Sequence, residues 1–131
     1  MLQRHTLDDP AIEGRWETVV GDFFQAVPPG ADFYVLKRII HDKSDADSLR
    51  ILRTVRDAMS ERSRLLIVDA VRPDADIPPS AVISDVLMLT VFDGLERSEE
   101  ELEELLSAAD LKSLRVVPTP GALSVVEVAP V

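Results

Sequence analysis

Apolar residues in the first half of the chain gather into three short runs with the composition of β-strands. The runs 32–36 and 64–71 are almost continuously apolar, which is typical of strands in a parallel sheet that is covered on both faces. The run 15–20 is rich in residues that favour strands and closes on Gly21, so we expect it to be a strand as well. Together these runs predict a sheet.

The pattern changes from strand-like runs to helical periodicity at residue 45. Ser44 and Asp47 are predicted to cap this helix, and the apolar residues behind them fall on one face: Leu49, Leu52, Val55 and Met59. A second helix is expected over 81–89, behind Ser80. The first of these two has the stronger amphipathic pattern.

The last part of the chain predicts a helix followed by a hairpin. Ser98 and Glu101 form a capping box, and the apolar stripe behind it comprises Leu102, Leu105, Leu106 and Ala109. The runs 114–117 and 123–128 flank a turn with two prolines and a glycine, 118–121. This arrangement predicts an antiparallel hairpin.

The order of these elements is strand, strand, helix, strand, helix, helix and hairpin. It is typical of the back half of an α/β sheet of Rossmann type. We therefore predict an α/β fold whose sheet is mainly parallel and ends in an antiparallel hairpin strand. A length of 131 residues with 46% hydrophobic residues suits a single domain, 1–131, with its own core.

Composition and charge exclude several classes of function. No apolar run approaches membrane-spanning length, and the residues after Met1 do not form a signal peptide, so we expect a cytoplasmic protein without membrane contact. The absence of cysteine excludes disulfides and thiolate metal sites, and we expect no metal. A formal net charge of −10 would repel phosphate backbones, so nucleic acid is not an expected partner.

The most informative motif begins at Leu36 and Lys37 and continues to His41 and Asp42. It resembles the Leu-Lys-x-x-x-His-Asp-Trp segment of S-adenosylmethionine-dependent O-methyltransferases of the plant caffeate and bacterial small-molecule type. Further blocks resemble the same family and stand in its order: 20–24, 65–69, 85–89 and 94–98. The resemblance covers nearly the whole chain. It implies the C-terminal part of an enzyme that methylates a hydroxyl of a small aromatic or polyketide-like metabolite.

The resemblance implies three catalytic residues. His41 corresponds to the general base, and the two acids that flank it correspond to Asp69 and Glu96, with Asp69 standing where plant members carry glutamate. A neutral imidazole can take a hydroxyl proton at about pH 7, and a carboxylate at one ring nitrogen leaves the other nitrogen free to accept. Taken without the family, the same residues also fit a hydrogen-bonded histidine at a strand end, a turn aspartate and a helix-entry acid.

The resemblance also implies contacts with the cofactor, S-adenosylmethionine, and with the methyl acceptor. Gly21, Asp22 and Phe23 resemble the segment that lies by the adenine of the cofactor. Lys37 resembles the lysine near its polar end. Met88 matches a methionine that lines the acceptor pocket, and a core methionine is an equal alternative.

Two departures from the family are visible. Lys43 stands where the family has a tryptophan after His-Asp, so the ring that would pack against the His41 segment is lost. The five glycines, at 14, 21, 30, 94 and 121, form no G-x-G-x-x-G loop, and no strand ends in the acid that would hold the ribose hydroxyls. The family's N-terminal dimerisation domain and two central strands are missing as well. Half of the cofactor site is therefore absent.

Three readings follow. The chain is the C-terminal part of an O-methyltransferase that other sequence completes, a non-catalytic small-molecule-binding or assembly module derived from that family, or an unrelated flavodoxin-like or regulatory domain. Expected partners are a small hydroxylated aromatic substrate and either a second copy or the missing N-terminal half, because the sheet would otherwise expose an apolar strand edge. Without the Gly-rich loop, S-adenosylmethionine is expected to bind the isolated chain weakly or not at all.

Overall fold

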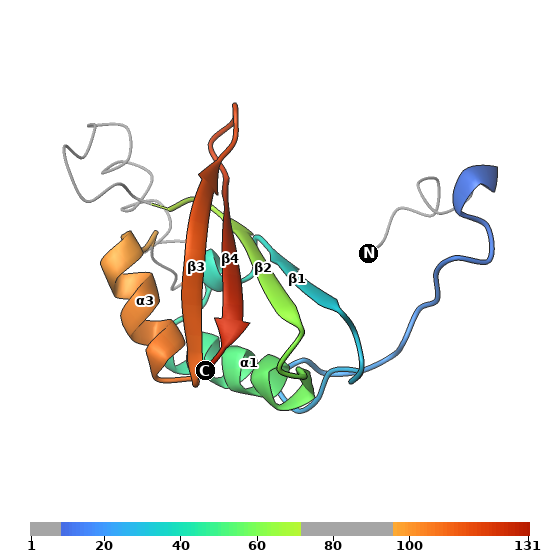
Figure 1. Cartoon of the computed structure of the whole chain (residues 1–131), viewed down its shortest axis with the longest axis horizontal. Helices are drawn as coiled ribbons and strands as arrows, with labels where there is room; N and C mark the ends of the chain where they lie inside the picture. The colour runs from blue at the N-terminus through green and yellow to red at the C-terminus, as the bar shows by residue number, and fades with distance from the viewer. Residues whose placement is uncertain (1–8, 72–95) are drawn as a thin grey trace.

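The computed structural model describes residues 9–71 and 96–131 (Figure 1). In chain order the elements are the 3-10 helix η2 (Pro10–Ile12), strand β1 (Phe33–Lys37), the 3-10 helix η3 (Ile40–Asp42), helix α1 (Asp45–Ala58), strand β2 (Arg64–Asp69), helix α3 (Glu99–Ser107), strand β3 (Leu111–Pro118) and strand β4 (Ser124–Pro130). The predicted helix at 81–89, with Met88, lies outside the described residues. Within these ranges, no helix is long and apolar enough to cross a membrane.

The four strands form one mixed sheet in the order β1-β2-β4-β3. Strands β1 and β2 are parallel, while β4 runs antiparallel to both β2 and β3. The α/β architecture and the terminal hairpin agree with the sequence prediction. The expectation of a mainly parallel sheet holds only for β1 and β2, because the hairpin supplies two of the four strands and β1 has a described neighbour on one side only.

The prediction of a strand at 15–20 is wrong. This segment is irregular and exposed, and it runs away from the sheet (Figure 1). Trp16 is 43% exposed and Val20 is fully exposed. A preference for the strand conformation depends on packing against neighbouring strands, and the segment pairs with none of the four strands of the described sheet.

Helices α1 and α3 begin at the predicted caps. The side-chain oxygen of Ser44 accepts a hydrogen bond from the backbone N–H of Asp47 at 3.2 Å. Ser98 and Glu101 exchange both hydrogen bonds of a capping box, at 2.8 and 3.1 Å. These contacts satisfy backbone donors that a helix N-terminus leaves unpaired.

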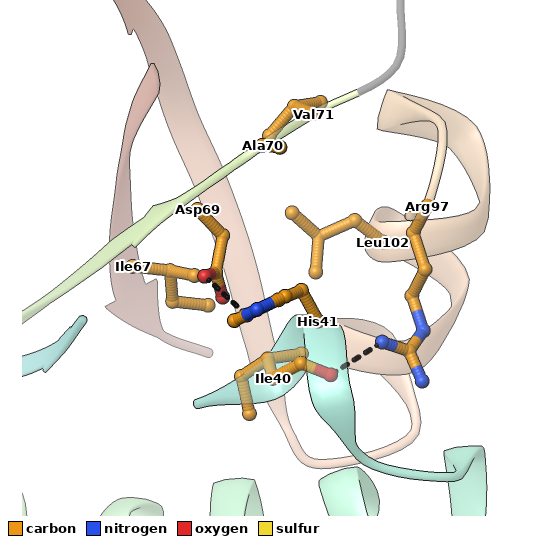
Figure 2. A pocket seen from close by; sticks show the side chains of 8 residues that line it. All are labelled: Ile40, His41, Ile67, Asp69, Ala70, Val71, Arg97 and Leu102. Carbon is orange, nitrogen blue, oxygen red and sulfur yellow. Dashed lines mark hydrogen bonds and ion pairs between the residues drawn. The ribbon is translucent and has the colours of Figure 1, made fainter. Parts of the chain in front are cut away.

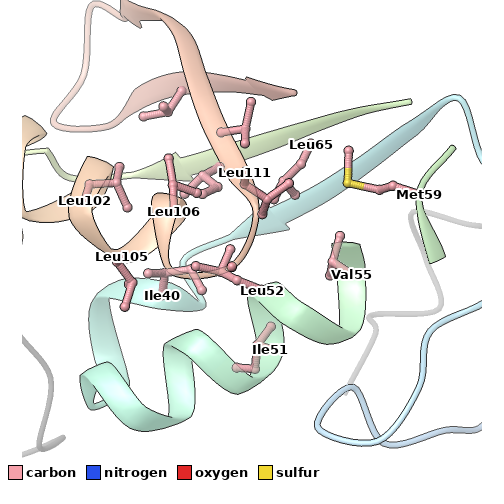
Figure 3. Packing of buried hydrophobic residues seen from close by; sticks show 14 residues of the cluster. Ile40, Ile51, Leu52, Val55, Met59, Leu65, Leu102, Leu105, Leu106 and Leu111 are labelled. Atoms are coloured by element: carbon pink, nitrogen blue, oxygen red, sulfur yellow. The ribbon is translucent and has the colours of Figure 1, made fainter. Parts of the chain in front are cut away.

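Both helices bury their apolar sides in one core against the sheet (Figure 3). The sheet contributes alternate residues, because successive side chains of a strand point to opposite faces. Leu65 and Ile67 of β2 are buried on the helix side, whereas Phe33 and Val35 of β1 are about 60% exposed on the other side. Only one face of the sheet is therefore fully covered by the described residues, and the expected covering of both faces is not met.

Candidate active site

The candidate active site lies where the parallel strands β1 and β2 end. Ligands and catalytic groups of α/β proteins gather at the carboxyl ends of parallel strands. After β1 the chain turns at Arg38, a non-glycine residue with a φ of 55°, and its backbone N–H donates to the carbonyl of Val68. The next turn, η3, carries His41, and Asp69 is the last residue of β2. Adjacent strands thus bring these two side chains together.

The His41 ring and the Asp69 carboxylate face each other (Figure 2). Nδ1 of His41 lies 3.0 Å from Oδ1 of Asp69, and the two side chains are 13% and 6% exposed. The contact has ion-pair distance, but the ring N–H is not aligned for a regular hydrogen bond, and neither carboxylate oxygen has another regular partner among the described residues. Buried polar atoms are usually paired in proteins, so this arrangement needs an explanation, and a catalytic role is one of those known for such groups.

A small cavity opens beside this pair. It is lined by Ile40, His41, Ile67, Asp69, Ala70, Val71, Arg97 and Leu102 (Figure 2). Its volume of about 10 Å³ is close to the smallest that holds one water. The lining is mostly apolar, which strengthens any electrostatic interaction within it.

Burial raises the pKa of the Asp69 carboxyl above its ordinary value. Removal from water disfavours the charged form of an acid. The charge and hydrogen-bonding groups of His41, and the backbone of Ile40, act in the opposite direction without cancelling this effect. The site therefore holds a carboxyl that is harder to ionise than usual, next to an imidazole.

Replacing Asp69 by asparagine is expected to change how stability depends on pH. Since its pKa is raised in the folded state, the native protein binds a proton that the unfolded chain releases above about pH 4. The wild type therefore loses stability as pH rises through this window, and the asparagine variant lacks that loss. Chemical unfolding of both proteins across pH should show the free energy of unfolding of the variant rising relative to wild type with pH.

A constant offset between the two proteins, from packing of the new amide, does not affect this slope. A difference in unfolding free energy that is independent of pH from about pH 4 upward would contradict the raised pKa.

Arg97 lies on the other side of the cavity and joins η3 to helix α1. Its guanidinium donates to the carbonyls of Ile40 and Lys43 at 2.8 and 3.0 Å. It also donates to the carboxylate of Asp45, at 2.7 and 3.0 Å, and to the hydroxyl of Ser48 at 3.3 Å. These contacts connect the turn before α1, the first turns of α1 and the entry to α3.

Sequence reasoning missed Arg97 and Ser48 as parts of this site. Ser48 is fully buried and lies four residues before the buried Leu52, so a polar residue on the apolar face of α1 was the available signal. Arg97 lies directly after Glu96 in one of the family-like blocks. Its burial, at 7% exposed, could not be read from that position.

The structure brings only His41 and Asp69 of the proposed catalytic residues into the cavity. Glu96 is half-buried beside Arg97 and is not among the residues that line the cavity. Lys37 is exposed at the end of β1. Lys37 does not line the cavity either.

The proposed adenine segment forms a separate, open hollow. Gly21, Asp22 and Phe23 line it with neighbours from Val19 to Pro28, and its volume is about 650 Å³. The carboxylate of Asp22 accepts hydrogen bonds from the backbone N–H of Phe24 and the side chain of Gln25, at 2.9 and 3.0 Å. This hollow shares no lining residue with the His41 cavity.

Comparison with known proteins decides the family. The family model of the O-methyltransferase domain matches residues 3–112 of this chain. The chain belongs to the O-methyltransferase family. This excludes the reading as an unrelated flavodoxin-like or regulatory domain.

Individual O-methyltransferases are similar over nearly the whole chain. The O-demethylpuromycin-O-methyltransferase of Streptomyces alboniger is 46% identical over 131 residues, which cover 96% of this chain and 35% of that enzyme. The SAH-bound structure of CalO1, a methyltransferase in calicheamicin biosynthesis, is similar with a TM-score of 0.87 and 42% identity, over 95% of this chain and 37% of that one.

A third relative was solved with an aromatic ligand. The O-methyltransferase NcsB1 from neocarzinostatin biosynthesis, in complex with S-adenosyl-L-homocysteine and 1,4-dihydroxy-2-naphthoic acid, is similar with a TM-score of 0.85 and 34% identity. That match covers 98% of this chain and 38% of NcsB1. The chain thus spans little more than a third of the length of these O-methyltransferases.

In the part of the chain that the structure describes, no three histidine, aspartate or glutamate side chains gather as metal ligands.

Proposed function

We propose that this chain supplies the general base of an S-adenosylmethionine-dependent O-methyltransferase that acts on a hydroxyl of a small aromatic or polyketide-like metabolite. The observation that carries the proposal is the 3.0 Å contact between Nδ1 of His41 and Asp69 at the carboxyl ends of β1 and β2. It occurs in a chain that belongs to the O-methyltransferase family. S-adenosylmethionine supplies the electrophilic methyl group when it is bound.

His41 takes the proton from the acceptor hydroxyl in this mechanism. With Asp69 at Nδ1, the ring keeps its proton on that nitrogen and presents Nε2 as the acceptor. Once Nε2 has accepted the proton, the imidazolium is stabilised by the ionised form of Asp69. The apolar walls of the cavity make this stabilisation stronger than it would be in water.

Glu96 is the second acid of the proposed site. Its place beside Arg97, at the entry to α3, brings it close in sequence to a residue that lines the His41 cavity. A carboxylate on the far side of the imidazole would add to the stabilisation of its charged form. Met88 is proposed to contact the acceptor, on the family resemblance alone.

The residues present fit one side of the cofactor only. Gly21, Asp22 and Phe23 line a hollow that is large enough for a nucleoside, and Lys37 is exposed for a polar contact. The chain has no Gly-rich loop after a strand, the element that normally supplies backbone donors to such a cofactor. These residues are therefore proposed to hold the adenine side, and the remaining contacts are proposed to come from other sequence.

The isolated chain should bind S-adenosylmethionine weakly or not at all for this reason. Titration calorimetry on the purified 131-residue chain is expected to give no saturable binding in the low micromolar range that is typical of enzyme substrates. Saturable binding at about 10 µM or tighter would contradict the view that half of the cofactor site is missing. An O-methyltransferase of full length serves as the positive control for the titration.

A chimaera tests the proposed activity directly. The chain would replace the matching segment of the Streptomyces alboniger enzyme, which is 46% identical to it, and transfer of labelled methyl groups would be measured. Hydroxylated naphthoic acids are suitable acceptors, because one relative carries such a compound in its name and another was solved in complex with one. Activity in the chimaera supports the proposed methyltransferase function, and its loss in a folded chimaera favours the alternative, a non-catalytic binding or assembly module.

A cytoplasmic location stays a prediction from the sequence.

A further inference from the structure

Arg97 is a buried cation whose acidic partner lies at the surface. Its side chain is 7% exposed, whereas the Asp45 carboxylate that it contacts is 74% exposed. Burying a guanidinium is costly unless it is well paired, and a carboxylate so open to water compensates little of that cost. The neutral acceptors around Arg97, the carbonyls of Ile40 and Lys43 and the hydroxyl of Ser48, therefore supply most of the pairing that offsets the cost of its burial.

Two of those acceptors bracket the histidine. The carbonyl of Ile40 precedes His41 and the carbonyl of Lys43 follows Asp42, and Arg97 donates to both (Figure 2 shows the first). Ser48 adds a weaker contact to the Ile40 carbonyl at 3.4 Å. The short turn η3 is thus held at both ends by one side chain, from a position more than fifty residues away in the sequence.

The turn itself has few other restraints. Its N-terminal flanking residue, Ile39, makes no side-chain capping hydrogen bond, and Arg38 before it adopts a left-handed φ of 55°, which L-residues disfavour. Lys43 follows the turn, and its side chain contacts the neighbouring Asp42. Among the described residues, the Arg38 N–H and the His41 ring hold the turn to β2. The buried side chain of Ile40 and the guanidinium of Arg97 fix its other side, toward the core and helix α1.

We propose that Arg97 is a positioning residue that holds η3 on helix α1 and thereby keeps the His41 ring at Asp69. The importance of this for catalysis rests on the proposed function, in which His41 is the base. The fork geometry of the guanidinium is essential, because Nη1 and Nη2 reach different carbonyls at the same time. A lysine ammonium keeps the charge but donates from one point, so it cannot replace both contacts.

The test compares Arg97→Lys and Arg97→Met with a control, Ser98→Ala, in the 131-residue chain. Ser98→Ala removes the cap of α3 directly beside Arg97 and destabilises the fold without touching η3. The chain has two histidines, so ¹⁵N NMR of the imidazole nitrogens assigns the tautomer of His41 at about pH 8, above the range in which imidazole ordinarily titrates. Hydrogen exchange of the Lys43 amide, which donates to the Ile40 carbonyl at 3.3 Å, reports on the turn.

Wild type and Ser98→Ala are expected to carry the proton on Nδ1, the nitrogen that faces Asp69. In both Arg97 variants the fraction of this tautomer should fall by about twofold or more, and the Lys43 amide should exchange about tenfold faster or more. A variant that retains the wild-type tautomer and exchange rate overturns the proposal. Arg97→Lys keeps the test decisive if Arg97→Met fails to fold, because it preserves the charge.

Catalysis supplies an independent readout in the active chimaera. Arg97→Lys should lower kcat by about tenfold or more and leave the KM for S-adenosylmethionine unchanged, since Arg97 acts through His41 on the acceptor. A rise in KM with unchanged kcat would overturn the positioning role. Normal turnover in a His41→Ala chimaera would refute the proposed function alone, because the tautomer measurement on the isolated chain needs no catalysis.

Discussion

Replacing His41 by alanine is expected to lower kcat by about 10²–10⁴-fold in an active enzyme that contains this chain, the usual contribution of a general base. The side chain lies at the carboxyl ends of the two parallel strands, 3.0 Å from a buried carboxylate, and no second histidine lines its cavity among the described residues. The affinity for S-adenosylmethionine should change little, because His41 is proposed to act on the acceptor. Steady-state methyl transfer with both substrates varied measures the two quantities separately.

Two further variants sharpen this test. His5→Ala removes the other histidine of the chain and is expected to leave turnover unchanged. His41→Gln keeps a polar side chain of similar size but cannot accept and release a proton near neutral pH, so it should be as inactive as the alanine variant. Near-normal turnover in either His41 variant would remove this residue from the mechanism.

Elements with a strong local signal could be predicted from the sequence. Helix α1 combines an apolar stripe with a cap at Ser44, and α3 combines a stripe with the capping box of Ser98 and Glu101. Strand β2 and the hairpin were equally clear, because apolar runs were bounded by turn residues. The failed strand at 15–20 has the same kind of composition, but a strand also needs a partner, and composition cannot reveal whether one is present.

The candidate site likewise has one part that the sequence indicated and another that only the structure reveals. The family resemblance implied that His41 and Asp69 lie together, and the structure places them at the carboxyl ends of two neighbouring parallel strands. Arg97 could not be placed, because its contacts with Ile40 and Asp45 span more than fifty residues and depend on how α3 packs against α1. The raised pKa of Asp69 is likewise a result of burial, which only the packed structure reveals.

The two edges of the sheet differ in how well they resist pairing with another chain. Strand β3 ends in Pro118, contains an irregularity between Ser113 and Arg115, and carries charged residues, all of which discourage edge pairing. Strand β1 has regular pairing with β2 over its whole length and exposes Phe33 and Val35. The edge of β1 is therefore the one that a further strand can extend.

We expect the purified chain to form a homodimer through the β1 edge when no completing sequence is present, with the exposed 15–20 segment able to exchange between copies. An unpaired apolar edge is a template for pairing, and identical chains most often satisfy it by two-fold symmetry. Light scattering over a dilution series measures the association. Val35→Lys on β1 should weaken it by about tenfold or more, or 1.4 kcal/mol, because a charge on an edge strand opposes pairing, whereas Val117→Lys on β3 should leave it unchanged. A monomer at high concentration, or equal effects of the two variants, would show that the β1 edge does not drive association.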